Sequence, residues 1–202
     1  METLKNPELG SIEVNGVTRQ AFLLRGALAA GAVYGVSAVT PFVSQSLAAT
    51  SDVDVLNFAL TLEYLETAFY KTSAKYLSGD VAKVASKNGA QEASHVNALT
   101  TVIKQLGGQP VTSPTFSFPV HDQASFLKLA QTLEDTGVSA YNGAAPSIQS
   151  KTVLGAAGSI VQIEARHASV IRLLNKETPA PNAFDPSLSM TQVLQAVKPL
   201  IA

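Results

Sequence analysis

The topology of this chain is decided by the stretch between its second and third helical segments, which reads Gln109-Pro110-Val111-Thr112-Ser113-Pro114-Thr115-Phe116-Ser117-Phe118-Pro119-Val120. Its prolines exclude a continuous helix, because proline lacks a backbone donor and clashes with the preceding turn. The stretch is also too long for a tight turn between antiparallel neighbours. It therefore predicts a crossover that runs back along a bundle, so that the helices before and after it lie parallel.

Four segments with helical periodicity flank this crossover, two on each side. Apolar residues recur in each at spacings of three and four, which is typical of amphipathic helices. The predicted helices run from an N-cap at Ser51 to about Tyr70, from about Asp80 to Leu106, from a cap at Asp122 to before Pro146, and from a cap at Ser150 to Leu174. A short amphipathic piece follows from Met190 to Ile201. Short, long and short connections predict an all-α four-helix bundle with one crossover and a short C-terminal helix.

Two of the three histidines follow a glutamate by three residues, in Glu92-Ala93-Ser94-His95 and Glu164-Ala165-Arg166-His167. Residues at this spacing share one face of a helix, so each pair can address one point in the bundle interior. The helix before each pair carries a lone glutamate, and a tyrosine follows that glutamate seven residues later. These residues are Glu63 with Tyr70, and Glu134 with Tyr141. The two halves thus correspond with an offset of 71 or 72 residues.

Four glutamates that converge in a bundle core require compensation, because desolvation and mutual repulsion disfavour their ionised forms. Two divalent cations would supply it if each took one terminal glutamate, one histidine and a share of two bridging carboxylates. Such ligands suit iron or manganese, and zinc is possible. The chain has no cysteine, which excludes a thiolate site and a disulfide framework. One glutamate from each of two helices and Glu-x-x-His from each of the other two is the known pattern of dinuclear carboxylate bundles.

Several neighbouring residues leave alternatives open. Glu66 lies one turn from Glu63 and could be the helix ligand in its place. We favour Glu63, because the position that corresponds to Glu66 in the second half is Gly137. Glu66 would then lie behind the ligands or face solvent. His121 in the crossover is predicted to be a surface residue, since no carboxylate lies at helical spacing from it. The two tyrosines are either ordinary core aromatics or functional groups that hydrogen-bond the ligands or donate electrons near the metals.

Residues 51 to about 175 resemble the ferritin-like superfamily. The stretch from Leu56-Asn57 through Leu62-Glu63 to Tyr70 is similar to the first helix of bacterioferritin-type proteins. Tyr141-Asn142-Gly143-Ala144-Ala145-Pro146 and Phe184-Asp185-Pro186 resemble the exported ferritin-like proteins, which include the desiccation-related proteins of plants and bacteria. The resemblance implies a metal-ligand set with bridging Glu92 and Glu164. Its members are Glu63, Glu92, His95, Glu134, Glu164 and His167.

The N-terminal part is predicted to be an export segment. No charged residue lies between Arg25 and Asp52, and the weakly apolar run there ends in small residues at positions 46–49. The stretch from Thr18 to Arg25 resembles a twin-arginine signal in which Gln20 replaces the second arginine. We therefore expect an export signal or a retained membrane anchor over 1–48, the bundle over 49–176, and a proline-rich tail with a docking helix over 177–202.

Composition limits the possible functions further. A net charge of −1 gives no basic surface for nucleic acid. The sequence favours an exported protein whose iron or manganese pair reacts with dioxygen or peroxide, as an oxidase, peroxidase or catalase. The alternatives are a bundle that sequesters metal without turnover, and a structural protectant against stress. Assembly into a homo-oligomer is possible, and a membrane would be a partner only if the leader is retained.

Overall fold

The computed structural model describes residues 13–14, 17–18 and 51–202, in two compact units, Met1–Gln45 and Ser46–Ala202. In the first unit, β1 (Glu13–Val14) and β2 (Val17–Thr18) pair as an antiparallel hairpin with Val14 opposite Val17. The rest of the predicted leader lies outside the described residues. Export, anchoring and cleavage therefore stay predictions.

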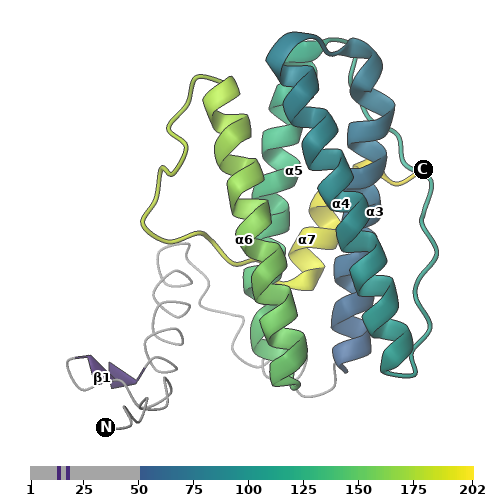
Figure 1. Ribbon diagram of the computed structural model, residues 1–202, viewed down its shortest axis with the longest axis vertical. Coiled ribbons are helices and arrows are strands. Elements are labelled where there is room, and N and C mark those ends of the chain that lie inside the picture. The colour runs from purple at the N-terminus through teal and green to yellow at the C-terminus, as the bar shows by residue number, and fades with distance from the viewer. Residues whose placement is uncertain (1–12, 15–16, 19–50) are drawn as a thin grey trace, which may run out of the picture. The chain divides into compact units, whose positions relative to one another are not determined.

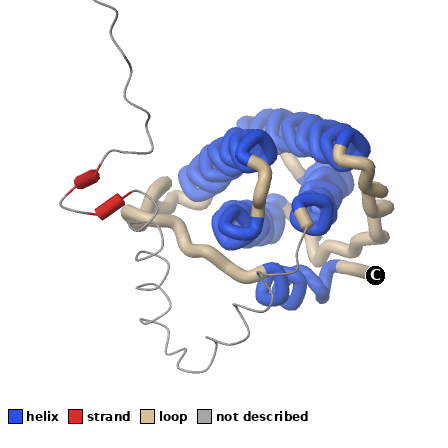
Figure 2. Tube along the Cα trace, turned by 90° about the horizontal axis from the view of Figure 1, so that it is seen from below, coloured by secondary structure: helices blue, strands red, loops and turns tan. Residues whose placement is uncertain are grey.

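The second unit is a bundle of four long helices (Figures 1 and 2). They are α3 (Asp52–Ser73), α4 (Gly79–Gln105), α5 (Gln123–Ala144) and α6 (Lys151–Leu174). Helix α3 packs chiefly against α4, and α5 packs chiefly against α6. A short helix, α7 (Met190–Val197), contacts α5. The predicted all-α bundle with a short C-terminal helix is confirmed. Within the described part of the chain, every helix is too short or too polar to cross a membrane.

Side-chain caps start three of the long helices where the sequence predicts. The Ser51 hydroxyl accepts a hydrogen bond from the Asp54 amide, and Asp54 accepts in return from the Ser51 amide. Asp122 and Ser125 form the same reciprocal pair at the start of α5, and the Ser150 hydroxyl accepts from the Val153 amide at the start of α6. These contacts satisfy amide donors that a helix start otherwise leaves unpaired. Helix α4 begins without a side-chain cap, at Gly79, whose φ of 58° is a conformation that glycine adopts readily.

The proline-rich stretch is the expected crossover. It follows α4 and runs back along the bundle to the start of α5, so that α4 and α5 point the same way (Figure 1). Asn57 of α3 fixes its first residues, since its amide group donates to the Gln109 carbonyl at 3.0 Å and accepts from the Val111 amide at 2.8 Å. The chain end fixes its middle, where Phe116 pairs with Ile201 as an antiparallel bridge.

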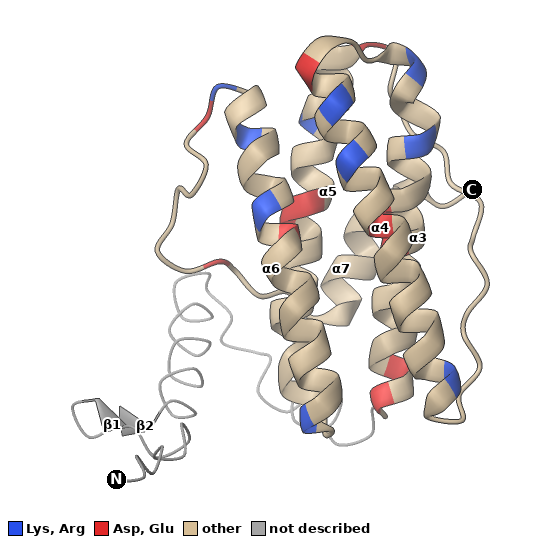
Figure 3. Ribbon diagram, viewed as in Figure 1, with Lys and Arg blue, Asp and Glu red and all other residues tan. Residues whose placement is uncertain are grey.

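The interior of the bundle is apolar over most of its volume but contains buried acids. One apolar cluster includes Phe69 and Phe126, whose rings stack with centroids 5.0 Å apart. A second cluster includes Leu60 and Ile103. The buried acids are Glu63, Glu66, Glu92, Glu134 and Glu164. Figure 3 shows acidic segments midway along the helices, in a bundle whose ribbons are mostly uncharged.

The tail that follows α6 is held against α5 by a close backbone approach. The Leu188 amide donates to the Ser139 carbonyl at 3.0 Å, and the Asn142 side chain donates to the Pro186 carbonyl at 3.3 Å. Next to Asn142, a Cβ atom added to Gly143 would lie 1.9 Å from the Leu188 carbonyl oxygen. Only glycine allows the tail to lie this close to the helix.

Candidate metal centre

The four long helices bring the predicted ligands together in two groups that share two residues. The first group consists of Glu63, Glu92, His95 and Glu164, and the second of Glu92, Glu134, Glu164 and His167. In each group, one donor atom per residue lies within 4.8 Å of every other. We call these groups the His95 position and the His167 position. Glu92 and Glu164 belong to both, as expected of bridging carboxylates.

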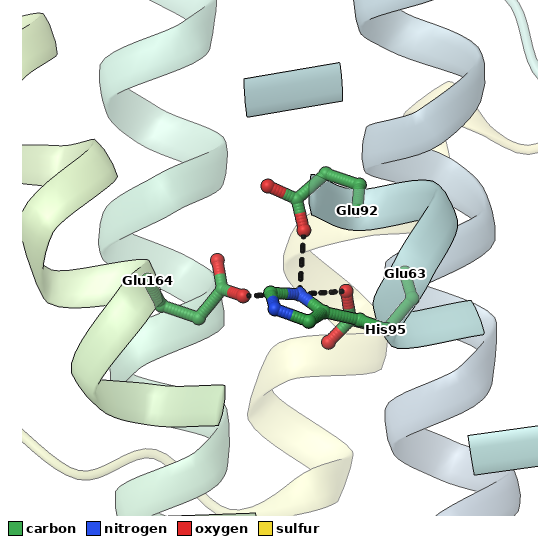
Figure 4. A group of neighbouring side chains, drawn as sticks. All are labelled: Glu63, Glu92, His95 and Glu164. Atoms are coloured by element: carbon green, nitrogen blue, oxygen red, sulfur yellow. Dashed lines mark hydrogen bonds and ion pairs between the residues drawn. The ribbon is translucent and has the colours of Figure 1, made fainter. Parts of the chain in front are cut away.

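At the His95 position, the imidazole ring projects from α4 among three carboxylates that come from three helices (Figure 4). The His95 Nδ1 atom lies 3.2 Å from Glu63 Oε2, 3.0 Å from Glu92 Oε2 and 3.0 Å from Glu164 Oε1. One imidazole nitrogen thus faces three acidic oxygens at hydrogen-bond distance.

At the His167 position, the arrangement is similar but the ring is held from both sides. The His167 Nδ1 atom lies 2.7 Å from a Glu92 oxygen, 3.5 Å from Glu134 and 3.7 Å from Glu164. Its Nε2 atom lies 2.9 Å from the Gln91 side-chain oxygen. Because an amide oxygen only accepts, Nε2 keeps its proton in this contact and leaves Nδ1 to face the carboxylates.

At both positions, the carboxylate oxygens outnumber the protons available to hydrogen-bond them. A bound cation would interact with the oxygens that lack a donor. A ring nitrogen can donate one hydrogen bond, yet each Nδ1 faces three carboxylates. Although Glu92 Oε1 is close to His167 Nδ1, the direction of this contact is not that of a hydrogen bond. Both atoms therefore remain unsatisfied, as do Glu134 Oε2 and both oxygens of Glu164. Two metal ions would pair with all of these atoms, so the carboxylate and imidazole donors fit a dinuclear centre.

In the absence of a metal, bound protons would offset the negative charge of the buried carboxylates. Burial lowers the pKa of His95 and of His167, but the surrounding carboxylates outweigh it and raise each pKa to about 12. Burial raises the pKa of Glu134 to about 8 and raises that of Glu63 well above its ordinary value. At Glu92, burial also acts upward, but the adjacent His167 and His95 imidazoles bring the pKa down to about 2. Both histidines are therefore protonated at neutral pH in the absence of a metal, and a metal that binds there would have to displace their protons.

The two tyrosines bind the lone glutamates crosswise between the halves of the bundle. Tyr70 of α3 donates to Glu134 of α5, and Tyr141 of α5 donates to Glu63 of α3 at 2.5 Å. Burial raises the pKa of both tyrosines well above the ordinary value, so both remain protonated donors. The Tyr70 hydroxyl also accepts from the Asn88 amide at 3.2 Å. Each tyrosine thus orients a predicted terminal ligand.

Replacing Tyr70 with phenylalanine is expected to lower the free energy of unfolding of the metal-free protein by about 1–3 kcal/mol, because buried Glu134 and Asn88 would lose their shared partner. Urea denaturation measures the change. Tyr76→Phe is the matched control, since the Tyr76 hydroxyl has no hydrogen bond among the described residues. Equal stability of the two variants would contradict the structural role of the Tyr70 network.

The structure decides between the two alternatives for Glu66 and adds two residues. Glu66 does not face solvent, because it is 3% exposed and lies beside the ligand carboxylates, although it belongs to neither group. Asn88 and Gln91 support the centre but were not predicted. Their counterparts in the second half are isoleucines, so the correspondence between halves gives no signal for them. His121 is exposed, as predicted.

Comparisons with known proteins agree with this architecture. A family model of the ferritin-like domain matches residues 51–177. A Bacillus anthracis structure described as a ferritin-like, diiron-carboxylate protein is 22% identical, with a TM-score of 0.55, and the alignment covers 61% of this chain and 94% of that one. A conserved hypothetical protein of Mycobacterium tuberculosis is 17% identical, with a TM-score of 0.59 and coverages of 66% and 96%. No curated protein matches the chain significantly. Since the family model spans more than half of its residues, this chain belongs to the ferritin-like domain family.

Proposed function

We propose that this protein binds a dinuclear iron or manganese centre that reacts with dioxygen or peroxide. The observation that carries the proposal is the sharing of Glu92 and Glu164 between two groups, in each of which one imidazole nitrogen faces three carboxylates. The description of the Bacillus anthracis structure as a diiron-carboxylate protein supports iron as the metal. Zinc would fit the same donors but would not support redox turnover.

The residues of the chain have separate tasks in this proposal. Glu63, Glu134, His95 and His167 would hold the metals terminally, while Glu92 and Glu164 would bridge them. Tyr70 and Tyr141 would fix the terminal carboxylates, and they lie close enough to the centre to supply an electron and a proton from their hydroxyls. When bound, the metal pair supplies one-electron chemistry toward oxygen species. The surrounding apolar bundle limits the access of water.

A test of turnover uses the full chain loaded with iron or with manganese. We expect the loaded protein to consume dioxygen or hydrogen peroxide over many cycles, as followed with an oxygen electrode and by peroxide absorbance. Tyr141→Phe and Tyr70→Phe separate the two roles of the tyrosines. Slower turnover at an unchanged metal content supports electron or proton donation, whereas a reduced metal content supports positioning only. Metal that binds without turnover would leave sequestration as the function.

Metal affinity is expected to rise steeply with pH. In the metal-free protein, the pKa of both histidines is about 12, so loading must release at least their two protons. Lowering the pH strengthens competition by these protons, and two protons correspond to about a hundredfold loss of overall affinity per pH unit. Mn²⁺ titrations at pH 6, 7 and 8, with proton release recorded in weak buffer, measure this dependence. Affinity that does not change with pH would contradict it.

A structural protectant is the second candidate function, supported by the resemblance of residues 141–146 and 184–186 to the exported, desiccation-related group. In that case the metal would serve mainly to stabilise the bundle. Chelation should then lower the melting temperature while dioxygen and peroxide consumption are absent. Unchanged melting after chelation of a loaded sample would exclude a stabilising metal.

We also propose export through the leader in residues 1–48, on the grounds of its charge pattern and small-residue exit. Cell fractionation and N-terminal sequencing of the native protein test this. A new N-terminus near Ala49 outside the cytoplasm supports cleavage, an intact chain in the membrane supports the anchor, and an intact cytoplasmic chain excludes both.

A further inference from the structure

Glu66 is a buried acid that the predicted ligand set does not explain. It is 3% exposed and lies on α3, one turn after Glu63. Among the described residues, none donates a hydrogen bond to its carboxylate or forms an ion pair with it. A buried carboxylate without a donor requires either a proton or a cation.

The space for this carboxylate exists because the facing residue of α5 is a glycine. A Cβ atom at Gly137 would lie 3.2 Å from Glu66 Oε1 and 3.7 Å from Glu164 Oε2. Both oxygens therefore lie beside the same point of the α5 backbone. Gly137 occupies the position that corresponds to Glu66 in the other half, so one half contributes a carboxylate and the other makes room for it.

The neighbours of Glu66 place it on the side of His167. Glu164 Oε2, the oxygen that also borders Gly137, is the Glu164 oxygen nearest to His167 Nδ1, at 3.7 Å.

One further contact and the exposure of the two histidine side chains distinguish the positions. The His167 ring is held at Nε2 by Gln91, whereas Nε2 of His95 has no hydrogen bond among the described residues. The side chain of His167 is 4% exposed and that of His95 is 12% exposed. The His167 position is thus more enclosed and better supported, and a hydrogen bond to a ligating histidine strengthens metal binding.

We propose that Glu66 is a fifth carboxylate ligand of the centre, at the His167 position, and that this position therefore holds its metal more tightly than the His95 position. The inference rests on the proposed dinuclear centre. The His95 position would then have fewer protein ligands and would leave room for a small oxygen species.

The test is a calorimetric titration of the metal-free full chain with Mn²⁺. We expect the wild type to bind in two steps whose affinities differ by at least about tenfold. Glu66→Gln keeps the shape of the side chain but should weaken the tighter step at least about tenfold and leave the weaker step within about twofold. Gly137→Ala, which crowds the Glu66 carboxylate, should weaken the same step to a smaller extent.

Two more variants complete the design. Gln91→Ala removes the support of His167 alone, so it should weaken the tighter step and thereby assign it. Gly155→Ala is the control for Gly137→Ala, because an added Cβ at Gly155 meets nothing within 4 Å. Circular dichroism of each metal-free variant establishes that the helices are intact.

The outcomes separate this inference from the proposed function. If the wild type binds neither Mn²⁺ nor, in the same titration, Fe²⁺, both are overturned. Two equal steps in the wild type, or a tighter step that survives Glu66→Gln unchanged, would overturn the inference and leave the dinuclear centre standing. Glu66 would then be a neutral carboxyl that fills the space beside Gly137. Weakening of the other step by Gln91→Ala would overturn the assignment to the His167 position.

Discussion

Replacing Glu92 with glutamine is expected to abolish tight metal binding at both positions. Glu92 is fully buried, contacts both histidines and belongs to both groups of ligands. Its loss would remove a bridging carboxylate, so we expect each affinity for Mn²⁺ or Fe²⁺ to fall by more than about a hundredfold, beyond the loss that follows removal of a supporting residue. Calorimetry and metal analysis after gel filtration measure the effect.

The control for this variant is Glu177→Gln, which makes the same chemical change at an exposed glutamate that binds Gln131. It should retain wild-type metal content. Glu164→Gln, at the other shared carboxylate, should reproduce the loss. If the Glu92 variant binds two ions with wild-type affinity, Glu92 is not a bridging ligand.

Replacing Gly143 with alanine is expected to destabilise the protein, although alanine is normally the better residue inside a helix. The new Cβ would lie 1.9 Å from the Leu188 carbonyl oxygen, so helix and tail would have to separate. Separation would break the hydrogen bonds of Leu188 and Asn142 and disturb the contact of α7 with α5. We expect a loss of about 3 kcal/mol, at the upper end for overpacking, measured by urea denaturation.

Gly155→Ala serves as the matched control, since its added Cβ has free space. It should raise the free energy of unfolding by about 0.5–1 kcal/mol through helix propensity alone. Opposite signs at the two glycines would show that Gly143 is required for docking of the tail. Stabilisation at both would mean that the tail does not lie against α5.

The sequence predicts the fold well because its signals are local. Ser51, Asp122 and Ser150 start helices through contacts with amides three residues away, and the prolines of the crossover exclude a helix whatever their surroundings. The repeated Glu-x-x-His spacing depends on helix geometry alone, so the proximity of the two pairs follows once the bundle forms.

Glu66 shows what the correspondence between the halves does not predict. Gly137 at the corresponding position favours Glu63 as the ligand, and the structure places Glu63, but not Glu66, in a group of candidate ligands. In the structure, that glycine is what admits the Glu66 carboxylate. Asn88 and Gln91 depend on contacts with Tyr70 and with His167 of another helix, which no spacing within α4 reveals. The contacts of these residues differ between the two halves because the side chains pack differently, and the repeated spacing of glutamates and histidines does not encode that packing.

The most direct test of the dinuclear centre is the metal content of the purified full chain after loading with iron or manganese and removal of excess ions. Plasma mass spectrometry, normalised to protein by amino-acid analysis, gives the number of ions per chain. The two groups of ligands predict two ions per chain. Fewer than one ion per chain, with the same content in Glu92→Gln, would contradict the centre.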